Sequence, residues 1–190
     1  MNTVNSNNNR TAILFGSPNT EGYTYRLLDA VLQHCPAEAP ADLICAYDLN
    51  IYPCYGCDGC KQTGYCVRSQ SDDFAQVDRI LHQSSRIILA TPIYFLGFPA
   101  PLKQIIDRFQ PYFYRSPFQT QPPKKALLLT TSGSNDNVGV EQIAATSRRV
   151  LEPLHAELVS TLSVKNTDRT FTVDVTACKT AAGLLFQNIS

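Results

Sequence analysis

Four of the seven cysteines of this 190-residue chain lie close together, in the segment PCYGCDGCKQTGYC at residues 53–66. They are Cys54, Cys57, Cys60 and Cys66, with the spacing C-x2-C-x2-C-x5-C. Bacterial ferredoxins begin a cubane iron–sulfur site with the same three-cysteine pattern. Zinc sites more often use two C-x2-C pairs that lie a dozen or more residues apart. The spacing therefore predicts a metal site and leaves the metal open, the alternative being a loop that is empty, reduced or disulfide-linked.

A second candidate site is the segment GSPNTEGYT at residues 16–24, where an apolar run ends and a helical pattern begins. Free backbone N–H groups, the positive end of a helix and the hydroxyls of Ser17, Thr20 or Thr24 can together bind an anion. The segment contains no Lys or Arg, so neutral donors would hold the anion, which suits one mononucleotide phosphate. It also lacks the Lys of a P-loop and the GxGxxG of a dinucleotide site. The alternative is an ordinary capped turn between a strand and a helix.

The third candidate follows another apolar run, in TPIYFLGFPAP at residues 91–101. Three prolines stiffen this segment, and residues 93–96 make it apolar. A stiff apolar loop with free backbone N–H and C=O groups can wrap a flat heteroaromatic ring. The alternative is that its aromatic residues, like those of residues 109–118, pack a core or a subunit interface.

The elements that must position these segments alternate between strands and helices. Strands are expected at residues 11–16, 42–47, 86–91, 125–133 and 157–164. Helices are expected around residues 27–32, within 71–84, from Pro101 to a stop at Pro111, over 138–155 and over 175–187. The cysteine segment, rich in Gly, is expected to be a loop. Apolar runs without polar alternation predict strands buried on both faces, and hence a doubly wound parallel α/β sheet.

Such sheets bind ligands beyond the carboxyl ends of their strands, where the strand order reverses. The loops of interest are therefore residues 16–24, 92–98 and 131–137. Residues 1–9, mostly Asn, Ser and Thr, are expected to form a disordered tail, and residues 10–190 a single domain.

Composition narrows the function classes. The formal net charge is zero, which argues against nucleic acid as a partner because phosphate binding needs clustered Lys and Arg. The first ten residues are polar and show no signal peptide, and the longest uncharged run, residues 87–102, is too short and too rich in Pro to span a membrane. We therefore expect a cytoplasmic protein without a membrane partner.

The three segments, in this order, resemble the flavodoxin-like NAD(P)H-dependent FMN reductases, and among these the cysteine-bearing iron–sulfur flavoproteins. The resemblance covers residues 10–165. It implies a flavodoxin-like three-layer fold with strand order 2-1-3-4-5, non-covalent FMN and NAD(P)H as the reductant. It also makes the four clustered cysteines candidate ligands of a [4Fe-4S] cluster.

The resemblance assigns residues to each part of FMN. The phosphate would contact Ser17, Asn19, Tyr23 and Thr24. The isoalloxazine ring would be lined by Pro92, Ile93, Tyr94, Phe95 and Leu96, and approached by Ser132, Gly133 and Ser134. The chain departs from the family at Asn19, where Arg is usual, at Tyr23, where Asn is usual, and in TTSGSND at residues 130–136, which replaces paired glycines.

The predicted function is electron transfer from NADH or NADPH through FMN to a small-molecule or protein acceptor, with a cluster, if present, passing single electrons. No side chain is predicted to be catalytic, because hydride transfer to a flavin needs no acid–base triad. The alternatives are a non-enzymatic flavodoxin-type carrier, which the neutral charge disfavours, and a clusterless reductase with a zinc or free-thiol loop. The resemblance also implies a homodimer or homotetramer. Cys35, Cys45 and Cys178 are expected in the core.

Overall fold

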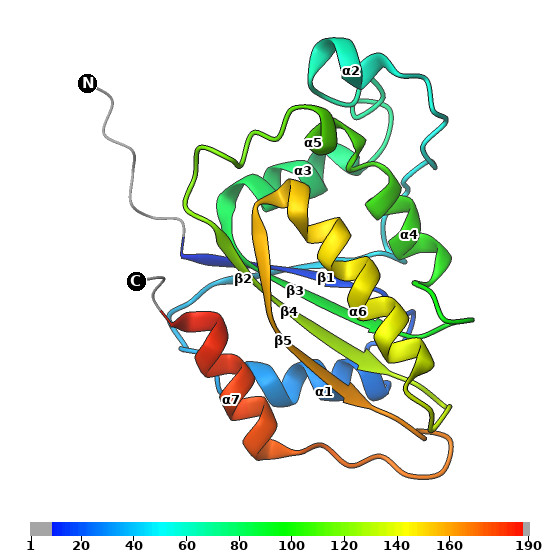
Figure 1. Cartoon of the computed structure of the whole chain (residues 1–190), viewed down its shortest axis with the longest axis vertical. Helices are drawn as coiled ribbons and strands as arrows, with labels where there is room; N and C mark the ends of the chain where they lie inside the picture. Colours follow the sequence, from blue (N-terminus) through cyan, green and yellow to red (C-terminus); the bar gives the residue numbers. More distant parts are fainter. Residues whose placement is uncertain (1–8, 188–190) are drawn as a thin grey trace.

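A computed structural model describes residues 9–187 of the chain, and it is built around a five-stranded parallel sheet (Figure 1). The strand order is β2-β1-β3-β4-β5, as predicted, with every neighbouring pair parallel. The strands are β1 (Arg10–Phe15), β2 (Ala41–Cys45), β3 (Ser84–Pro92), β4 (Lys124–Thr131) and β5 (Ala156–Val164). The reversal of order between β1 and β3 creates the switch point at which such sheets bind ligands.

The central strands are buried on both faces, which explains their continuous apolar runs. In β3, Ile87 and Leu89 belong to the core on one face, and Ile88 and Ala90 belong to the core on the other. All four side chains are fully buried. The alternation follows from the two-residue period of a strand, and burial on both faces favours apolar side chains along the middle of the strand.

Helices cover both faces and form a three-layer molecule (Figure 1). On one face lie α1 (Tyr23–Leu32) and α7 (Val175–Phe186). On the other lie α3 (Phe74–Gln83), α4 (Ala100–Asp107), α5 (Gln110–Tyr114) and α6 (Val138–Leu151). Each long helix follows a strand, so the carboxyl ends of all five strands point to one edge of the sheet.

Two short helices differ from the expected pattern. Within the cysteine segment, expected to be a loop, residues Gly59–Thr63 form α2. Pro111 does not simply stop the preceding helix: α4 ends at Asp107, and Pro111 lies in the first turn of α5, where its missing N–H costs nothing. Similarly, the helix predicted over 138–155 ends at Leu151 and continues as a 3₁₀ turn, Glu152–Leu154, that contains Pro153.

The prediction of a disordered tail concerns residues 1–9, of which residues 1–8 lie outside the described part of the chain. The longest helix between residues 9 and 187 has 14 residues, and none of the described helices has the length and hydropathy of a bilayer-spanning segment.

Candidate functional site

A cavity of about 250 Å³ opens at the carboxyl edge of the sheet; we call it the edge cavity. It lies where β1, β3, β4 and β5 end and where α1 begins. Its lining residues are Ser17, Asn19, Gly22, Tyr23, Thr24, Pro92, Ile93, Tyr94, Thr131, Ser132, Gly133, Thr167 and Asp168. The fold thus brings together nine of the twelve residues predicted to contact FMN, from three separate loops.

The first loop of the edge cavity is shaped by its own hydrogen bonds. The backbone N–H of Asn19 donates to Ser17 Oγ over 3.2 Å, and the Asn19 side-chain oxygen accepts from the N–H of Glu21 over 2.8 Å. Gly22 is the N-cap of α1 and has no side chain to satisfy the first turn. The leading N–H groups of α1 therefore lack a side-chain cap at the wall of the cavity, which is favourable for an anion.

A buried pair of hydroxyls joins this loop to the end of β4. Thr24 Oγ1 lies 2.7 Å from Thr131 Oγ1, and the two residues are 3% and 4% exposed. Each hydroxyl has one proton to donate and further capacity to accept. When one hydroxyl of the pair donates to the other, the accepting hydroxyl keeps its own proton for a ligand in the cavity.

The second loop forms a tight turn in which two of the predicted ring contacts lie outside the lining of the edge cavity. Tyr94 and Gly97 exchange backbone hydrogen bonds of 3.1 and 2.9 Å. Phe95 and Leu96, at the centre of the turn, have φ values of 49° and 62°. Phe95 is fully exposed, and neither residue lines the edge cavity. Only Pro92, Ile93 and Tyr94 of the five predicted residues line it.

The third loop contributes Ser132 and Gly133 to the lining, whereas Ser134 lies outside it. Ser134 instead donates its hydroxyl to Asp136, whose pKa this hydrogen bond lowers. The N–H of Ser134 donates to Ser132 Oγ over 3.1 Å. These bonds turn the chain away from the cavity and into α6.

A fourth loop, between β5 and α7, also lines the edge cavity and was missed by the sequence reasoning. It supplies Thr167 and Asp168. Phe171 from the same loop stacks on Tyr23, with ring centroids 4.9 Å apart. The available signal was the parallel sheet itself, because the loop after the fifth strand must emerge at the same edge as the other three.

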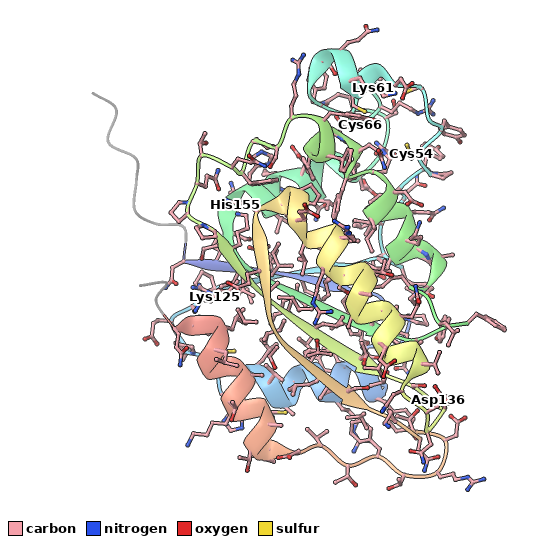
Figure 2. The ribbon with its side chains drawn as sticks, viewed as in Figure 1. Cys54, Lys61, Cys66, Lys125, Asp136 and His155 are labelled. Atoms are coloured by element: carbon pink, nitrogen blue, oxygen red, sulfur yellow. The ribbon has the colours of Figure 1, made fainter. Side chains whose placement is uncertain are left out.

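The four clustered cysteines line a second cavity, of about 260 Å³, which we call the cysteine cavity. Figure 2 shows Cys54 and Cys66 together at the α2 end of the molecule, whereas Asp136, after β4, lies near the opposite end. Among the described residues, none lines both cavities. Arg68 and Arg108 are the cationic residues of the cysteine cavity, and the Arg68 guanidinium lies 4.5 Å from the ring centre of Tyr55.

Two glycines allow the sharp turns of the cysteine segment. Gly56 and Gly64 have φ values of +63° and +78°, a region that side chains disfavour. Gly64 also ends α2, with its N–H donating to the carbonyl of Cys60 over 2.9 Å.

The structure brings the four thiols to one cavity without placing them as ligands of a single ion. In the part of the chain that the structure describes, all seven cysteines are free, and no three His, Cys, Asp or Glu side chains form a group that could hold a metal ion. Burial raises the pKa of the Cys60 thiol, and the nearby Cys66, Cys54 and Cys57 raise it further. Cys60 thus lies within electrostatic range of the other three cysteines.

A buried ion pair lies against the cysteine cavity. Arg108 Nη1 lies 2.6 Å from Asp72 Oδ2, and their side chains are 2% and 0% exposed. Arg108 also donates to the carbonyl of Tyr52 over 2.9 Å, just before the cysteine segment. Its buried Nε has no hydrogen-bond partner among the described residues. Burial lowers the pKa of Arg108, but the hydrogen bonds with Asp72 and Cys66 outweigh burial and raise it above its ordinary value.

The three cysteines that were predicted in the core, and the histidines, do not line either cavity. Cys45 and Cys178 are buried, as predicted, and Cys35 is half-buried. His155 Nδ1 contacts the carbonyl of Phe118 at 3.2 Å, and His82 Nδ1 contacts that of Asp78 at 2.8 Å. None of the described histidines lines either cavity.

Flavodoxin-like proteins bind their ligand in a cavity at the switch point of the sheet. Comparison with solved structures supports this class of fold. An NAD(P)H:quinone oxidoreductase from Methanothermobacter marburgensis has a similar fold, with a TM-score of 0.73, 15% identity, and 95% and 98% of the two chains covered. An FMN-dependent NADH-azoreductase from Bacillus anthracis, solved in complex with FMN, has a TM-score of 0.60 and 15% identity over 91% and 93% of the chains.

Residues 9–165 match the NADPH-dependent FMN reductase family, and the chain belongs to this family. It is 34% identical over 103 residues to an iron–sulfur flavoprotein of Archaeoglobus fulgidus, covering 54% of this chain and 46% of the relative. An iron–sulfur flavoprotein of Methanocaldococcus jannaschii is 35% identical over 97 residues, covering 50% of this chain and 49% of the relative. The aligned region thus spans about half the length of these curated relatives. The predicted resemblance, including its end near residue 165, is confirmed.

Proposed function

We propose that the chain is an FMN-dependent NAD(P)H oxidoreductase that binds FMN in the edge cavity and passes electrons from a nicotinamide to an acceptor. The observation that carries the proposal is the edge cavity itself. It combines the uncapped N-terminus of α1 and buried hydroxyls on one side with the apolar residues Pro92 and Ile93 on the other. These are the groups that a phosphate and a flat ring, respectively, require.

The phosphate of FMN would be held by neutral donors. Ser17 and Thr24 are nearly buried, and the first turn of α1 adds backbone N–H groups. Asn19 stands where the family usually has Arg, but its side chain already shapes the loop through the N–H of Glu21. Preformed donors lose little entropy on binding, which compensates in part for the absence of a cation.

The ring would lie against Pro92, Ile93 and Tyr94, near Ser132 and Gly133. The edge cavity is smaller than the roughly 300–1,000 Å³ of sites that bury a whole drug-sized ligand, so it would enclose only part of FMN. When bound, FMN accepts a hydride from the nicotinamide and passes electrons to the acceptor. The protein orients the ring and leaves one part of it open to these reactants.

We further propose that the cysteine cavity holds a [4Fe-4S] cluster. A cubane spreads its four thiolates over its corners, farther apart than the ligands of one ion, so four thiols around a cavity fit it better than they fit zinc. A cluster with four thiolates is anionic, and Arg68 and Arg108 supply positive charge at the cavity. The unpaired buried Nε–H of Arg108 is a donor of the kind that bonds cluster sulfurs.

The proposal extends to assembly, acceptor and location. Of the aromatic segment 109–118, Phe109, Tyr112 and Phe118 are buried in the core, whereas Phe113 is 73% and Tyr114 41% exposed. The two exposed rings support a homodimer or homotetramer with this segment at the interface. A small-molecule or protein acceptor and a cytoplasmic location complete the proposed function.

The first experiment tests FMN binding and turnover together. Titration of the apoprotein should quench FMN fluorescence, and the complex should oxidise NADH or NADPH continuously with a dye acceptor. Binding without continuous oxidation would favour an electron carrier, and no binding would refute the proposal. Thr24→Val should weaken FMN binding about tenfold or more, the value of a hydrogen bond to a charged group. Thr146→Val removes an exposed hydroxyl on α6 and is the matched control.

The second experiment tests the cluster. Protein purified without oxygen should contain about four irons and four sulfides per chain, the stoichiometry of one cubane. Cys57→Ser should lose most of the iron and retain FMN, whereas Cys35→Ser, outside the cavity, should retain both. Zinc in place of iron, or neither metal in the wild type, would refute the cluster and leave a clusterless reductase.

A further inference from the structure

The edge cavity has an unusual charge for a site that would bind an anionic mononucleotide. Among the described residues that line it, Asp168 is the one Asp, Glu, Lys or Arg. The cavity therefore carries a net negative charge and no cation. A carboxylate in this position would repel the FMN phosphate, so its presence requires a different explanation.

The backbone that precedes Asp168 places its carboxylate at the cavity. In the turn before it, the N–H of Asn166 donates to the carbonyl of Ser134, and the N–H of Thr167 donates to that of Ser132, both over 3.0 Å. A Cβ added at Gly133 would lie only 2.5 Å from Asp168 Oδ2. The carboxylate thus packs directly on the backbone of Gly133, in the space that any other residue's side chain would fill.

This carboxylate has no partner in the part of the protein that the structure describes. Among residues 9–187, none donates a hydrogen bond to its side chain and none forms an ion pair with it. Asp168 is exposed and lines the cavity, so an acceptor without a donor among the described residues is available there for a ligand. On FMN, the groups that could donate to it are the ribityl hydroxyls and the N3–H of the ring. Both are uncharged and separate from the phosphate.

We infer that Asp168 accepts a hydrogen bond from the uncharged part of FMN and lowers the reduction potential of the bound flavin. The inference rests on the proposed function. Reduction of FMN by two electrons and one proton adds one negative charge to the ring. A carboxylate near the ring opposes that charge, so it weakens binding of reduced FMN more than binding of oxidised FMN. The bound, reduced FMN would then be a stronger reductant of the acceptor.

The test compares three variants that separate the effect of the Asp168 charge from the effects of side-chain size and of total charge. Asp168→Asn removes the charge, Asp168→Glu retains it, and Glu141→Gln removes a charge from an exposed position on α6 as the control. For each, the dissociation constant of oxidised FMN is measured by fluorescence quenching and the midpoint potential of the bound flavin by equilibration with a reference dye.

Asp168→Asn should favour reduced FMN about tenfold, which is a rise of about 30 mV for a two-electron couple. Asp168→Glu and Glu141→Gln should stay within about twofold of the wild type, or 9 mV by the same conversion. An unchanged potential in Asp168→Asn, with FMN still bound, would overturn the inference alone. An equal rise in Glu141→Gln would also overturn it, because the effect would then be one of total charge. Failure of the wild type to bind FMN would overturn the proposed function and this inference with it.

Discussion

Replacing Asp72 by Asn removes the negative charge that faces the buried guanidinium of Arg108. The two side chains are 0% and 2% exposed, so water cannot replace the lost partner. Removing one partner of a buried ion pair costs about 3–5 kcal/mol, because the remaining charge is left uncompensated. In a chain of this length, that loss corresponds to a fall in Tm of roughly 6–20 °C.

Urea denaturation measures this loss, and the surface pair of Arg149 and Glu152 provides the control. Those side chains are 83% and 69% exposed, so Glu152→Gln should cost only about 0–1 kcal/mol. The double variant Asp72→Leu/Arg108→Met removes both buried charges and should be more stable than Asp72→Asn alone. If Asp72→Asn cost no more than Glu152→Gln, the reasoning about this pair would be refuted.

The same variant should change the response to acid. Burial raises the pKa of Asp72, but hydrogen bonds from Arg108 and from the backbone N–H groups of Phe74 and Tyr52 outweigh burial and lower it below its ordinary 3.8. The unfolded chain therefore binds the proton more readily, and the free energy of unfolding falls as the pH drops below about 4. Asp72→Asn should lack this part of the fall. If the free energy of unfolding fell equally with pH in the two proteins, the effect could not be assigned to Asp72.

Four further variants test the packing, a buried charge and the backbone by urea denaturation. Gly16→Ala should cost about 1–3 kcal/mol, because its Cβ would lie 2.7 Å from Leu102 Cδ2 in a tightly packed core; a neutral effect would show that Leu102 can move. Burial lowers the pKa of Lys124 to about 8, so the unfolded chain binds more protons than the folded chain between about pH 8 and 10.5. The free energy of unfolding should therefore rise through that range relative to that of Lys124→Met. A difference between the two proteins that did not change with pH would refute the lowered pKa. Gly64→Ala, at φ +78°, should cost about 1–2 kcal/mol, whereas Gly183→Ala, inside α7 with open space around it, should stabilise by about 0.5–1 kcal/mol; equal effects would refute the role of the positive φ.

Local patterns in the sequence determined the order of strands and helices. Runs such as residues 86–91 contain no polar alternation because both faces of β3 are covered, and this burial is visible in the residue types alone. The parallel sheet then follows, and with it the edge where loops 16–24, 92–98 and 131–137 meet. Nine of the twelve predicted FMN contacts line one cavity for this reason. The spacing of the four cysteines likewise indicated that they share one cavity.

The tertiary structure decided which side chains of those loops face inward. Phe95 and Leu96 were predicted to line the ring, but they lie in the two-residue turn between Tyr94 and Gly97 and do not line the cavity. No local pattern predicts this, because the direction of a side chain on a turn depends on φ and ψ, which a sequence of apolar residues leaves open.

Contacts between segments that are far apart in the sequence also could not be predicted from it. Arg108 and Asp72 are 36 residues apart, and their pairing beside the cysteine cavity depends on how α4 packs against the start of α3. Asp168 reaches the edge cavity only because β5 is the edge strand beside β4, whose loop leaves room at Gly133. The sequence determines the elements through local propensity and burial, whereas the charges that act on each cavity come from long-range packing, which only the folded chain specifies.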